Sequence, residues 1–444
     1  MDPFEQIPDE LLVVQALELD LPSVTRFCQT SRRFNRVVCE NESYWHQKFI
    51  RDYGFDPRKY EGSWRLLYRE YMSLWGFGST RSGQLSLDDV NEEPTPTKLS
   101  EIKPKQVSTG QNHTIIIDLT NDVWVVGANS HGQLGLGDEK NRSTWTRLPG
   151  MKAQRVATGE LHTVLIDLEK NVWTFGNNYS GQLGLGDRDH RLIPTMIPNL
   201  KAIEVSAGND HTLLIDPERS VWGFGSNWSL GDNHPGVSPK PFWFGRRLLE
   251  EIPPKQPEET LDDYFKRYNR NIVPIKAQQV AAGHGHTVIL TFDGEVWTYG
   301  ISYSGELGRD SSRDEYYDAR YQVDGIVGKQ VAAGHFYTVV LDVDNEVWVF
   351  GDNRKGQLGL GQDVIQVDRP VRLGMSAKRI EAGDSQTFLI DFEDDVWATG
   401  YNDSGQLGLG DFDIRYQPTQ IPNLKAYQIS TGRDQTVLIG TMLT

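Results

Sequence analysis

The chain has 444 residues, and its 45 Lys and Arg against 61 Asp and Glu give a formal net charge of −16. A chain this acidic, with no basic run, is not expected to bind nucleic-acid phosphates or an anionic membrane surface. No segment approaches the roughly 20 consecutive apolar residues of a membrane span, and the first residues, MDPFEQIPDE, lack the features of a signal peptide.

Residues 1–73 have the periodicity of short helices. Glycine is scarce in this segment, and apolar residues recur every three or four positions. Pro8 starts the phrase IPDELLVVQALELD, and the acidic Asp9 and Glu10 stand in the first turn, where a helix favours negative charge. The pattern breaks at Pro22 and again near Ser31. The segment therefore predicts a small domain of three or four helices.

The order of the phrases IPDELL and LPSVTRFCQTSRRFNRVV, followed by Trp45, resembles an F-box over residues 5–72, and GSWRLLYREYM resembles the helix that often follows one. That resemblance implies binding to the Skp-type adaptor of a cullin ubiquitin ligase. The residues that would face the adaptor are Pro8, Leu11, Leu12, Leu21, Pro22 and Val24. Those expected in the domain's own core are Phe27, Phe34, Val37 and Trp45. The alternative is a helical cap whose apolar residues are all structural.

Both cysteines of the chain, Cys28 and Cys39, lie in this helical segment. So few cysteines are typical of a protein from a reducing compartment. We expect two thiols in an apolar helical core. We therefore expect the protein in the cytoplasm or nucleus of a eukaryotic cell, or of one infected by a virus, because cullin ligases are eukaryotic.

The rest of the chain, residues 74–444, repeats two phrases. A Trp–Gly phrase such as VWTFG occurs seven times, at Trp75, Trp124, Trp173, Trp222, Trp297, Trp348 and Trp397. A second phrase such as ATGELHTVLI also occurs seven times, and most tryptophans are followed by a glycine loop such as GQLGLGD. The tryptophans are 49, 49, 49, 75, 51 and 49 residues apart. A regular period of this length indicates a solenoid, a propeller or another repeat array.

Each repeat reads as short antiparallel strands. In HTIIIDLTNDVWVVG, two runs of β-branched and aromatic residues flank a polar turn, which is typical of a hairpin. We predict a mainly β fold, a seven-bladed β-propeller in which Thr436–Ile439 and Leu74–Phe77 pair and close the ring. Such closure removes the free sheet edges that would recruit other chains.

The phrases G-x-x-H-T, V-W-x-x-G and G-Q-L-G-L-G resemble repeats of the regulator of chromosome condensation family over residues 74–444. That resemblance implies an alternative function, guanine-nucleotide exchange on a Ran-like small GTPase. Asp210 in GNDHT matches an acidic position of the family's exchange face, but Gly285 and Ser385 stand where an Asp and a His are expected. The GWRHT motif of the plant UV-B photoreceptor is absent from the seven phrases.

The histidine of the second phrase is not expected to be catalytic. It is His113, His162, His211 and His286 in four repeats, but Tyr337, Gln386 and Gln435 in the others. A metal ligand or general base cannot become Gln and keep its chemistry, whereas a hydrogen-bonding brace can. With no phosphate-binding loop, metal-ligand spacing or nucleophile motif, the sequence predicts no catalytic residue, metal or cofactor and no enzyme.

The long spacing after Trp222 indicates an insertion over residues 233–275. Its aromatic residues are Phe242, Trp243 and Phe244 in the first half and Tyr264 and Tyr268, at helical spacing, in the second. Exposed aromatics on a rigid scaffold commonly serve recognition, so these residues, with Asp210, are candidates for target binding. The alternative is a lid that folds back onto the ring.

The sequence thus predicts an adaptor. The helical domain would bind the Skp-type adaptor and the cullin core, and the propeller would hold a protein to be ubiquitinated. Exchange on a Ran-like GTPase, or a scaffold with neither role, are the alternatives.

Overall fold

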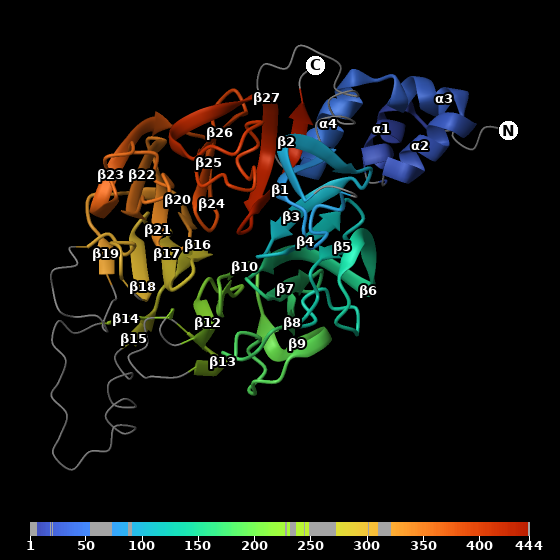
Figure 1. Ribbon diagram of the computed structural model, residues 1–444. Coiled ribbons are helices and arrows are strands. Elements are labelled where there is room, and N and C mark those ends of the chain that lie inside the picture. The colour runs from blue at the N-terminus through green and yellow to red at the C-terminus, as the bar shows by residue number, and fades with distance from the viewer. Residues whose placement is uncertain are drawn as a thin grey trace, which may run out of the picture.

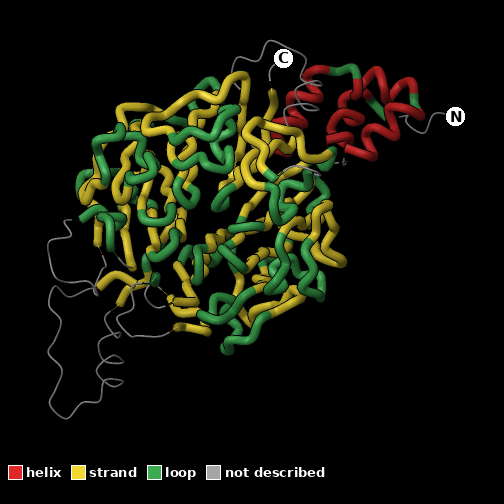
Figure 2. Tube along the Cα trace, viewed as in Figure 1, coloured by secondary structure: helices red, strands yellow, loops and turns green. Residues whose placement is uncertain are grey.

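The computed structural model describes residues 7–17, 19, 21–53, 73–87, 91–226, 229–230, 237–243, 245–247, 272–300, 302–309 and 321–442. The described chain is mainly β, with a helical module at its N-terminal end (Figure 2). The helices are α1 (Asp9–Leu17), α2 (Leu21–Thr30), α3 (Arg32–Phe34), the π-helix η1 (Asn35–Cys39) and α4 (Glu42–Tyr53). None of the helices among the described residues is long and apolar enough to cross a membrane.

The helical module has a core of its own. Phe34, Val37 and Trp45, all predicted core residues, are at most 9% exposed, and Phe27 packs against them from a half-buried position. Polar groups inside the module are bonded: the Trp45 indole N–H donates to the carbonyl of Cys39 at 2.9 Å. Ser31 caps α3 by accepting from the Phe34 N–H at 3.0 Å, as expected of a Ser at a helix start.

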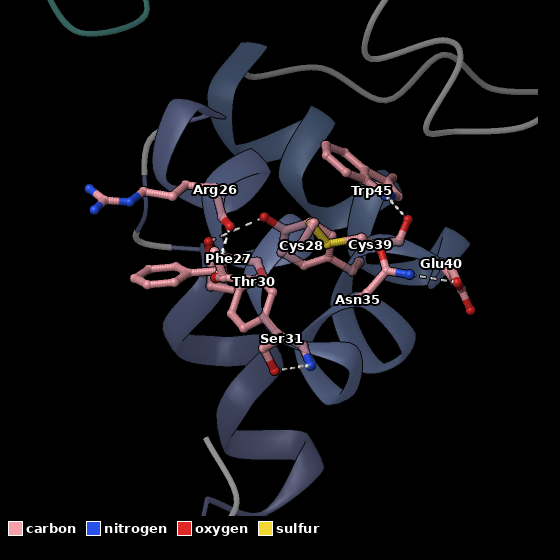
Figure 3. The surroundings of a disulfide bond; sticks show 12 residues. Arg26, Phe27, Cys28, Thr30, Ser31, Asn35, Cys39, Glu40 and Trp45 are labelled. Atoms are coloured by element: carbon pink, nitrogen blue, oxygen red, sulfur yellow. Dashed lines mark hydrogen bonds between the residues drawn. A yellow bond between two sulfur atoms is a disulfide. The ribbon is translucent and has the colours of Figure 1, made fainter. Parts of the chain in front are cut away.

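Cys28 of α2 and Cys39 of η1 form a disulfide (Figure 3). The expectation of two thiols was therefore wrong, although Cys39 is fully buried as expected. The chain bends at Ser31 and passes through the short α3 into η1, which brings the two Cα atoms to 6.1 Å, within the usual range for a disulfide. A disulfide is also at odds with the reducing compartment that the cysteine count suggested.

The strands form antiparallel ladders of four, some of them joined into larger sheets. One sheet contains, in spatial order, β2 (Glu92–Ser100), β1 (Ser73–Ser79), β28 (Gln435–Met442), β27 (Arg415–Thr431), β26 (Asp395–Gly400), β25 (Gln386–Ile390) and β24 (Arg379–Ala382). A second contains β3 (Pro104–Thr109), β4 (His113–Asp118), β5 (Asp122–Gly127), β6 (Arg142–Thr158), β7 (His162–Asp167), β8 (Asn171–Gly176) and β9 (Arg191–Lys201).

Three further sheets have four strands each. They are β10 (Glu204–Ala207), β11 (His211–Ile215), β12 (Val221–Ser226) and β13 (Val237–Trp243); β16 (Ala277–Ala282), β17 (His286–Thr291), β18 (Val296–Gly300) and β19 (Tyr321–Val323); and β20 (Gly328–Ala333), β21 (Tyr337–Asp342), β22 (Glu346–Asp352) and β23 (Gln366–Ser376). β14 (Gly245–Arg247) pairs with β15 (Ile272–Pro274). The sheets follow one another around a common centre, with the C-terminal strands beside the first ones (Figure 1).

Two long strands belong to two ladders each, which explains the larger sheets. The first part of β6, from Arg142 to Lys152, pairs with β5, and the part from Ala153 to Thr158 pairs with β7. β27 divides between β26 and β28 in the same way. The predicted pairing of the first and last strands is present, with Leu74 opposite Ile439 and Phe77 opposite Thr436.

Part of the segment 233–275 is a regular strand. β13 pairs with β12, so that Trp243 lies opposite Trp222 and Phe242 opposite Gly223 in the backbone register. These two residues therefore stand on the outer strand of a ladder. Their side chains, and the whole of Phe244, Tyr264 and Tyr268, lie outside the described residues, so the role in target binding stays a prediction.

Neighbouring ladders pack through interlocking loops and aromatic rings. Gly408 of a GQLGLGD loop has a φ of +70°, and a Cβ there would come within 2.9 Å of the Phe77 ring in the next ladder. The repeated tryptophans are half-buried and bonded: the Trp397 indole N–H donates to the Asp391 carboxylate at 2.9 Å. The glycine loops and the tryptophans are thus structural parts of the repeat.

Candidate functional site

The innermost strands of the ladders surround a channel of about 760 Å³. Glutamine side chains on its wall join neighbouring strands: Gln106 donates to the Val156 carbonyl and accepts from the Val156 N–H, both at 3.2 Å. Gln279, Gln330 and Gln428 make the same pair of bonds to the next inner strand. A side-chain amide thus supplies the hydrogen bonds that two sheets of a ring cannot exchange directly.

The remaining inner strands carry charged residues at that position. The Arg155 Nε and Glu204 Oε2 atoms are 3.9 Å apart, and Arg379 donates to the Tyr427 carbonyl at 2.9 Å. Glu381 also lines the channel, and its burial there raises its pKa to about 8. The channel wall is therefore polar and carries the positive charges of Arg155 and Arg379.

One mouth of the channel is a hollow of about 250 Å³. Each G-x-x-H-T-type phrase contributes to it the residue that follows its glycine. These residues are Gln111, Glu160, Asn209, His284, His335, Asp384 and Arg433. All seven are polar or charged, although the sequence varies from repeat to repeat. We refer to this set as the mouth ring.

Four members of the mouth ring are in contact. Asn209 Nδ2 lies 3.0 Å from His284 Nε2, the His284 and His335 rings stack with centroids 4.0 Å apart, and His335 Nδ1 lies 3.1 Å from Asp384 Oδ1. Burial, followed by the nearby His335, lowers the pKa of His284, whereas burial raises the pKa of Glu160. On this side of the mouth the lowered pKa therefore favours the uncharged form of His284, which stacks on the Asp384-bonded His335.

Aromatic side chains extend this side of the mouth outward. The Phe336 ring packs 4.1 Å from the His335 ring, and Tyr303 lies edge-on to Phe336 at 6.0 Å. The Tyr303 side chain is 62% exposed. A polar hollow bordered by exposed aromatics can hold a protein partner. Among the described residues, no group of three or more His, Cys, Asp and Glu side chains is arranged to hold a metal ion.

Asp210, the residue predicted from the family pattern, lies just behind the mouth ring. Its carboxylate accepts from the Ser229 hydroxyl at 3.0 Å and lies 3.9 Å from His211 Nδ1. Burial opposes ionisation of Asp210, but His211, Ser229 and His284 together lower its pKa. Its neighbour Asn209 lines the hollow instead. The sequence analysis compared the residue just before the His and so missed the mouth ring. A comparison of the residue one position earlier in the aligned phrases would have found it.

The histidines of the second phrase are braces, as predicted. His113 Nε2 lies 3.1 Å from the Thr163 hydroxyl of the next repeat, and that hydroxyl donates its hydrogen to the Gln133 carbonyl at 2.8 Å. Because the Thr hydrogen is already used, the imidazole must be the donor, through Nε2. The same arrangement recurs at His162, His211 and His286.

Where the repeats carry Tyr or Gln instead, the bond between neighbours is kept. The Tyr337 hydroxyl donates to the Gln386 carbonyl at 2.6 Å, and Gln435 Nε2 donates to the Gly110 carbonyl at 2.9 Å. The glycine of the phrase makes room for this side chain: a Cβ on Gly110 would lie 2.3 Å from His113 Cε1. The glycine and the His position therefore join neighbouring repeats, whereas the residue after the glycine lines the hollow.

The expected adaptor surface is only partly on the outside of the helical module. Pro8 is exposed, and Leu11 is 53% exposed. Leu12 and Val24, which we expected at the surface, are instead buried at 1% and 0%, because the helices pack these two side chains into the module's core. The side chains of Leu21 and Pro22 lie outside the described residues. Sequence reasoning missed Val14, which is 58% exposed and three positions from Leu11 on the same helix face.

Fold and site together define a repeat β-propeller with a polar channel mouth. The model of the regulator of chromosome condensation (RCC1) repeat matches residues 73–117, 121–166, 170–215, 344–390 and 393–439, and a second model of that repeat matches 105–133, 277–306 and 329–357. These matches cover more than half of the chain. The chain belongs to the RCC1-repeat family.

Curated relatives match over short stretches. The ultraviolet-B receptor UVR8 of Arabidopsis thaliana is 35% identical over 88 residues, which is 20% of this chain and 20% of the receptor. The RCC2 homologue of Xenopus laevis is 30% identical over 102 residues, which is 22% of this chain and 20% of that protein. The chain thus spans about a fifth of the length of these relatives.

Solved structures match over most of the chain. Human WBSCR16 superposes with a TM-score of 0.70 and 19% identity, over 83% of this chain and all of the other. Prp20p of Saccharomyces cerevisiae, described with its binding properties to Gsp1p and histones, superposes with a TM-score of 0.69 and 18% identity, over 84% of this chain and 92% of the other. At these identities the likeness establishes the fold.

Proposed function

We propose that this chain is a non-catalytic scaffold that holds a small GTPase of the Ran type at its channel mouth. The observation that carries the proposal is the mouth ring, in which every repeat supplies one polar side chain to the same hollow. Family membership and the Gsp1p binding described for Prp20p support the choice of partner. We also infer that the repeats form seven blades and that the β1–β28 pairing closes the ring; the order of the ladders supports both.

Binding of a purified Ran-type GTPase to the full chain, measured by biolayer interferometry, tests the proposal. We expect saturable binding, weakened about ten-fold by Asp384→Ala, because that carboxylate orders His335 and the aromatic side of the mouth. Asp344→Ala is the matched control, since Asp344 is exposed at the other end of β21. No binding, or equal effects of the two substitutions, would reject the proposal.

Nucleotide exchange is the stronger form of this proposal. Release of a fluorescent guanine nucleotide from the same GTPase would measure it. Gly285 and Ser385 lack the side chains that the family's exchange face uses, so we expect binding with little acceleration of release. Rapid release at micromolar protein would establish exchange and overturn the scaffold assignment.

A second candidate is the ubiquitin-ligase adaptor, favoured by the exposed apolar side chains of Leu11 and Val14 on α1. Two large apolar residues on one face of a short helix are suited to dock a partner. Leu11→Asp should abolish pull-down by a purified Skp-type adaptor, whereas Gln15→Ala, at an exposed position of the same helix, should not. Because Leu11 is exposed, its substitution leaves the core intact, and a failure of wild type to bind ends this assignment.

A further inference from the structure

A largely apolar groove of about 580 Å³ lies between the ladders of the first two complete repeats. It is lined by Leu136, Leu148, Met151, Leu168, Trp173 and Ile193. Leu168, in the turn between β7 and β8, is 53% exposed, and Ile193 of β9 is 58% exposed. Single exposed apolar residues are ordinary, but two that border one apolar groove indicate a surface that is covered in use.

In the repeat one step earlier, the equivalent side chains belong to a larger apolar cluster. The equivalents of Leu136, Leu148, Met151, Leu168 and Trp173 there are Leu87, Leu99, Ile102, Leu119 and Trp124. Trp145 stands at the position of Pro194, which also lines the open groove, and the counterpart of Ile193 is Thr144. These five equivalents and Trp145 belong to the hydrophobic cluster that also contains the core of the helical module. Leu119 is half-buried, whereas its counterpart Leu168 is exposed. The first groove and the core of the helical module thus belong to one hydrophobic cluster, whereas Leu168 of the second groove is exposed.

The open groove continues that internal interface. Trp145, which packs against the shared cluster, and Leu148, which lines the open groove, lie three residues apart on β6. The helical module stands beside β1 and β2, in the ladder that precedes β3–β6 (Figure 1). No side chain blocks the end of the groove. Gly150, with a φ of +69°, stands at the turn there, and nothing lies within 4 Å of where its Cβ would be. The equivalent turns of other repeats carry the side chains of Asn199 and Asn423 instead.

The rim of the groove is acidic. Lys152 is used internally, since its ammonium contacts the Asp122 carboxylate and the Thr120 carbonyl, both at 2.9 Å. Burial opposes ionisation of Asp167, but the Trp173 and Asn171 hydrogen bonds lower its pKa, so it is charged near neutral pH. Glu169 stands exposed beside Leu168. A partner that fills the groove therefore gains from a Lys or Arg next to its apolar side chains.

We propose that this groove binds an amphipathic helix of a partner protein, with large apolar residues on one face and Lys or Arg at the edge that meets Glu169. The helical form follows from the first groove, which shares its cluster with helices. A helix places residues three and four positions apart on one face. If those residues are apolar, this face can lie in an apolar groove. The surface is separate from the channel mouth.

The probe for the test is a fluorescein-labelled synthetic helix with Leu at i, i+3, i+4 and i+7 and Lys on its polar face. A second probe has Glu in place of Lys. Fluorescence anisotropy with the full chain should show saturable binding of the Lys probe and weaker binding of the Glu probe. Leu168→Asp should weaken the Lys probe about ten-fold or more, because it puts a carboxylate in the apolar groove.

Phe392→Asp is the matched control, because Phe392 occupies the same turn position in a later repeat and is 55% exposed. It should leave the affinity unchanged. Equal affinities of the two variants, or no saturable binding to wild type, would overturn the proposal. Sedimentation without probe provides a second readout: a dimer that Leu168→Asp dissociates would assign the groove to a second copy of this chain instead.

Discussion

The buried histidines of the ring make the protein sensitive to acid, and the size of the effect follows from the structure. His113, His162 and His286 are fully buried, and burial lowers their pKa from 6.5 to about 3. The unfolded chain therefore binds more protons than the folded one between these two values. Because the folded pKa is the lower one, the free energy of unfolding is highest above pH 6.5 and falls as the pH decreases toward 3.

The loss can be calculated at pH 5. The pH is then about 1.5 units below the unfolded pKa of each histidine. The free energy of unfolding therefore decreases by about 2 kcal/mol for each one. The three together account for about 6 kcal/mol, which is comparable to the whole stability of many domains, about 5–15 kcal/mol. We therefore expect the ring to be marginally stable at pH 5 and firmly folded at pH 7.5.

The chain itself suggests the substitution that tests this reasoning. Gln435 occupies the same position as the histidines and donates to the Gly110 carbonyl of the next repeat without titrating. In His113→Gln, the decrease in the free energy of unfolding between pH 7.5 and pH 5.0 should be about 2 kcal/mol smaller than in wild type. Urea denaturation at the two pH values measures this difference, independently of any change in stability that the substitution causes at pH 7.5.

His131→Gln is the control, since His131 is a half-exposed residue of a surface loop. It should leave the pH dependence as it is in wild type. If His113→Gln and wild type lose the same stability on acidification, the folded state protonates this histidine readily. The account of His113 as a neutral, buried donor would then be refuted.

Two further predictions concern stability. Reducing the Cys28–Cys39 disulfide, or Cys28→Ser, should destabilise the helical module by about 3 kcal/mol from the entropy of the short closed loop, measurable by thermal unfolding with and without a thiol reductant. Gly408→Ala should destabilise the ring by about 2 kcal/mol or more, because its positive φ and the Phe77 ring both oppose a Cβ. Gly374→Ala is the control, since Gly374 has a positive φ but nothing within 4 Å. It should cost about half as much stability in the same melting assay.

Much of the fold could be predicted because the same sequence pattern occurs in every repeat. The spacing of the tryptophans, the hairpin pattern and the split of the two phrases predicted the strands and the pairing of Leu74 with Ile439. The brace role of His113 was predictable because other repeats replace that histidine with Gln. Repetition supplies a comparison within one chain, which substitutes for homologues.

The rest could not be predicted because it depends on tertiary packing. Leu11 and Leu12 are adjacent and equally apolar, so only the rotation of α1 against its neighbours decides that Leu12 is buried. The proximity of Cys28 and Cys39 likewise depends on how α2, α3 and η1 pack against one another. The prolines of Val237–Trp243 gave no indication of a strand in the sequence. The segment is a strand nevertheless, because its pairing with β12 overrides its local preference.

Within each G-x-x-H-T-type phrase the brace and the residue that lines the channel mouth are at different positions. The glycine admits the His, Tyr or Gln side chain behind it, and that side chain bonds to the next repeat. The residue after the glycine contributes to the channel mouth, and the chain varies it from Gln111 to Arg433. Contacts within the mouth ring are partly exposed and contribute little to stability. If the proposed binding at the mouth holds, substitutions there should change the partner while the braces keep the repeats folded.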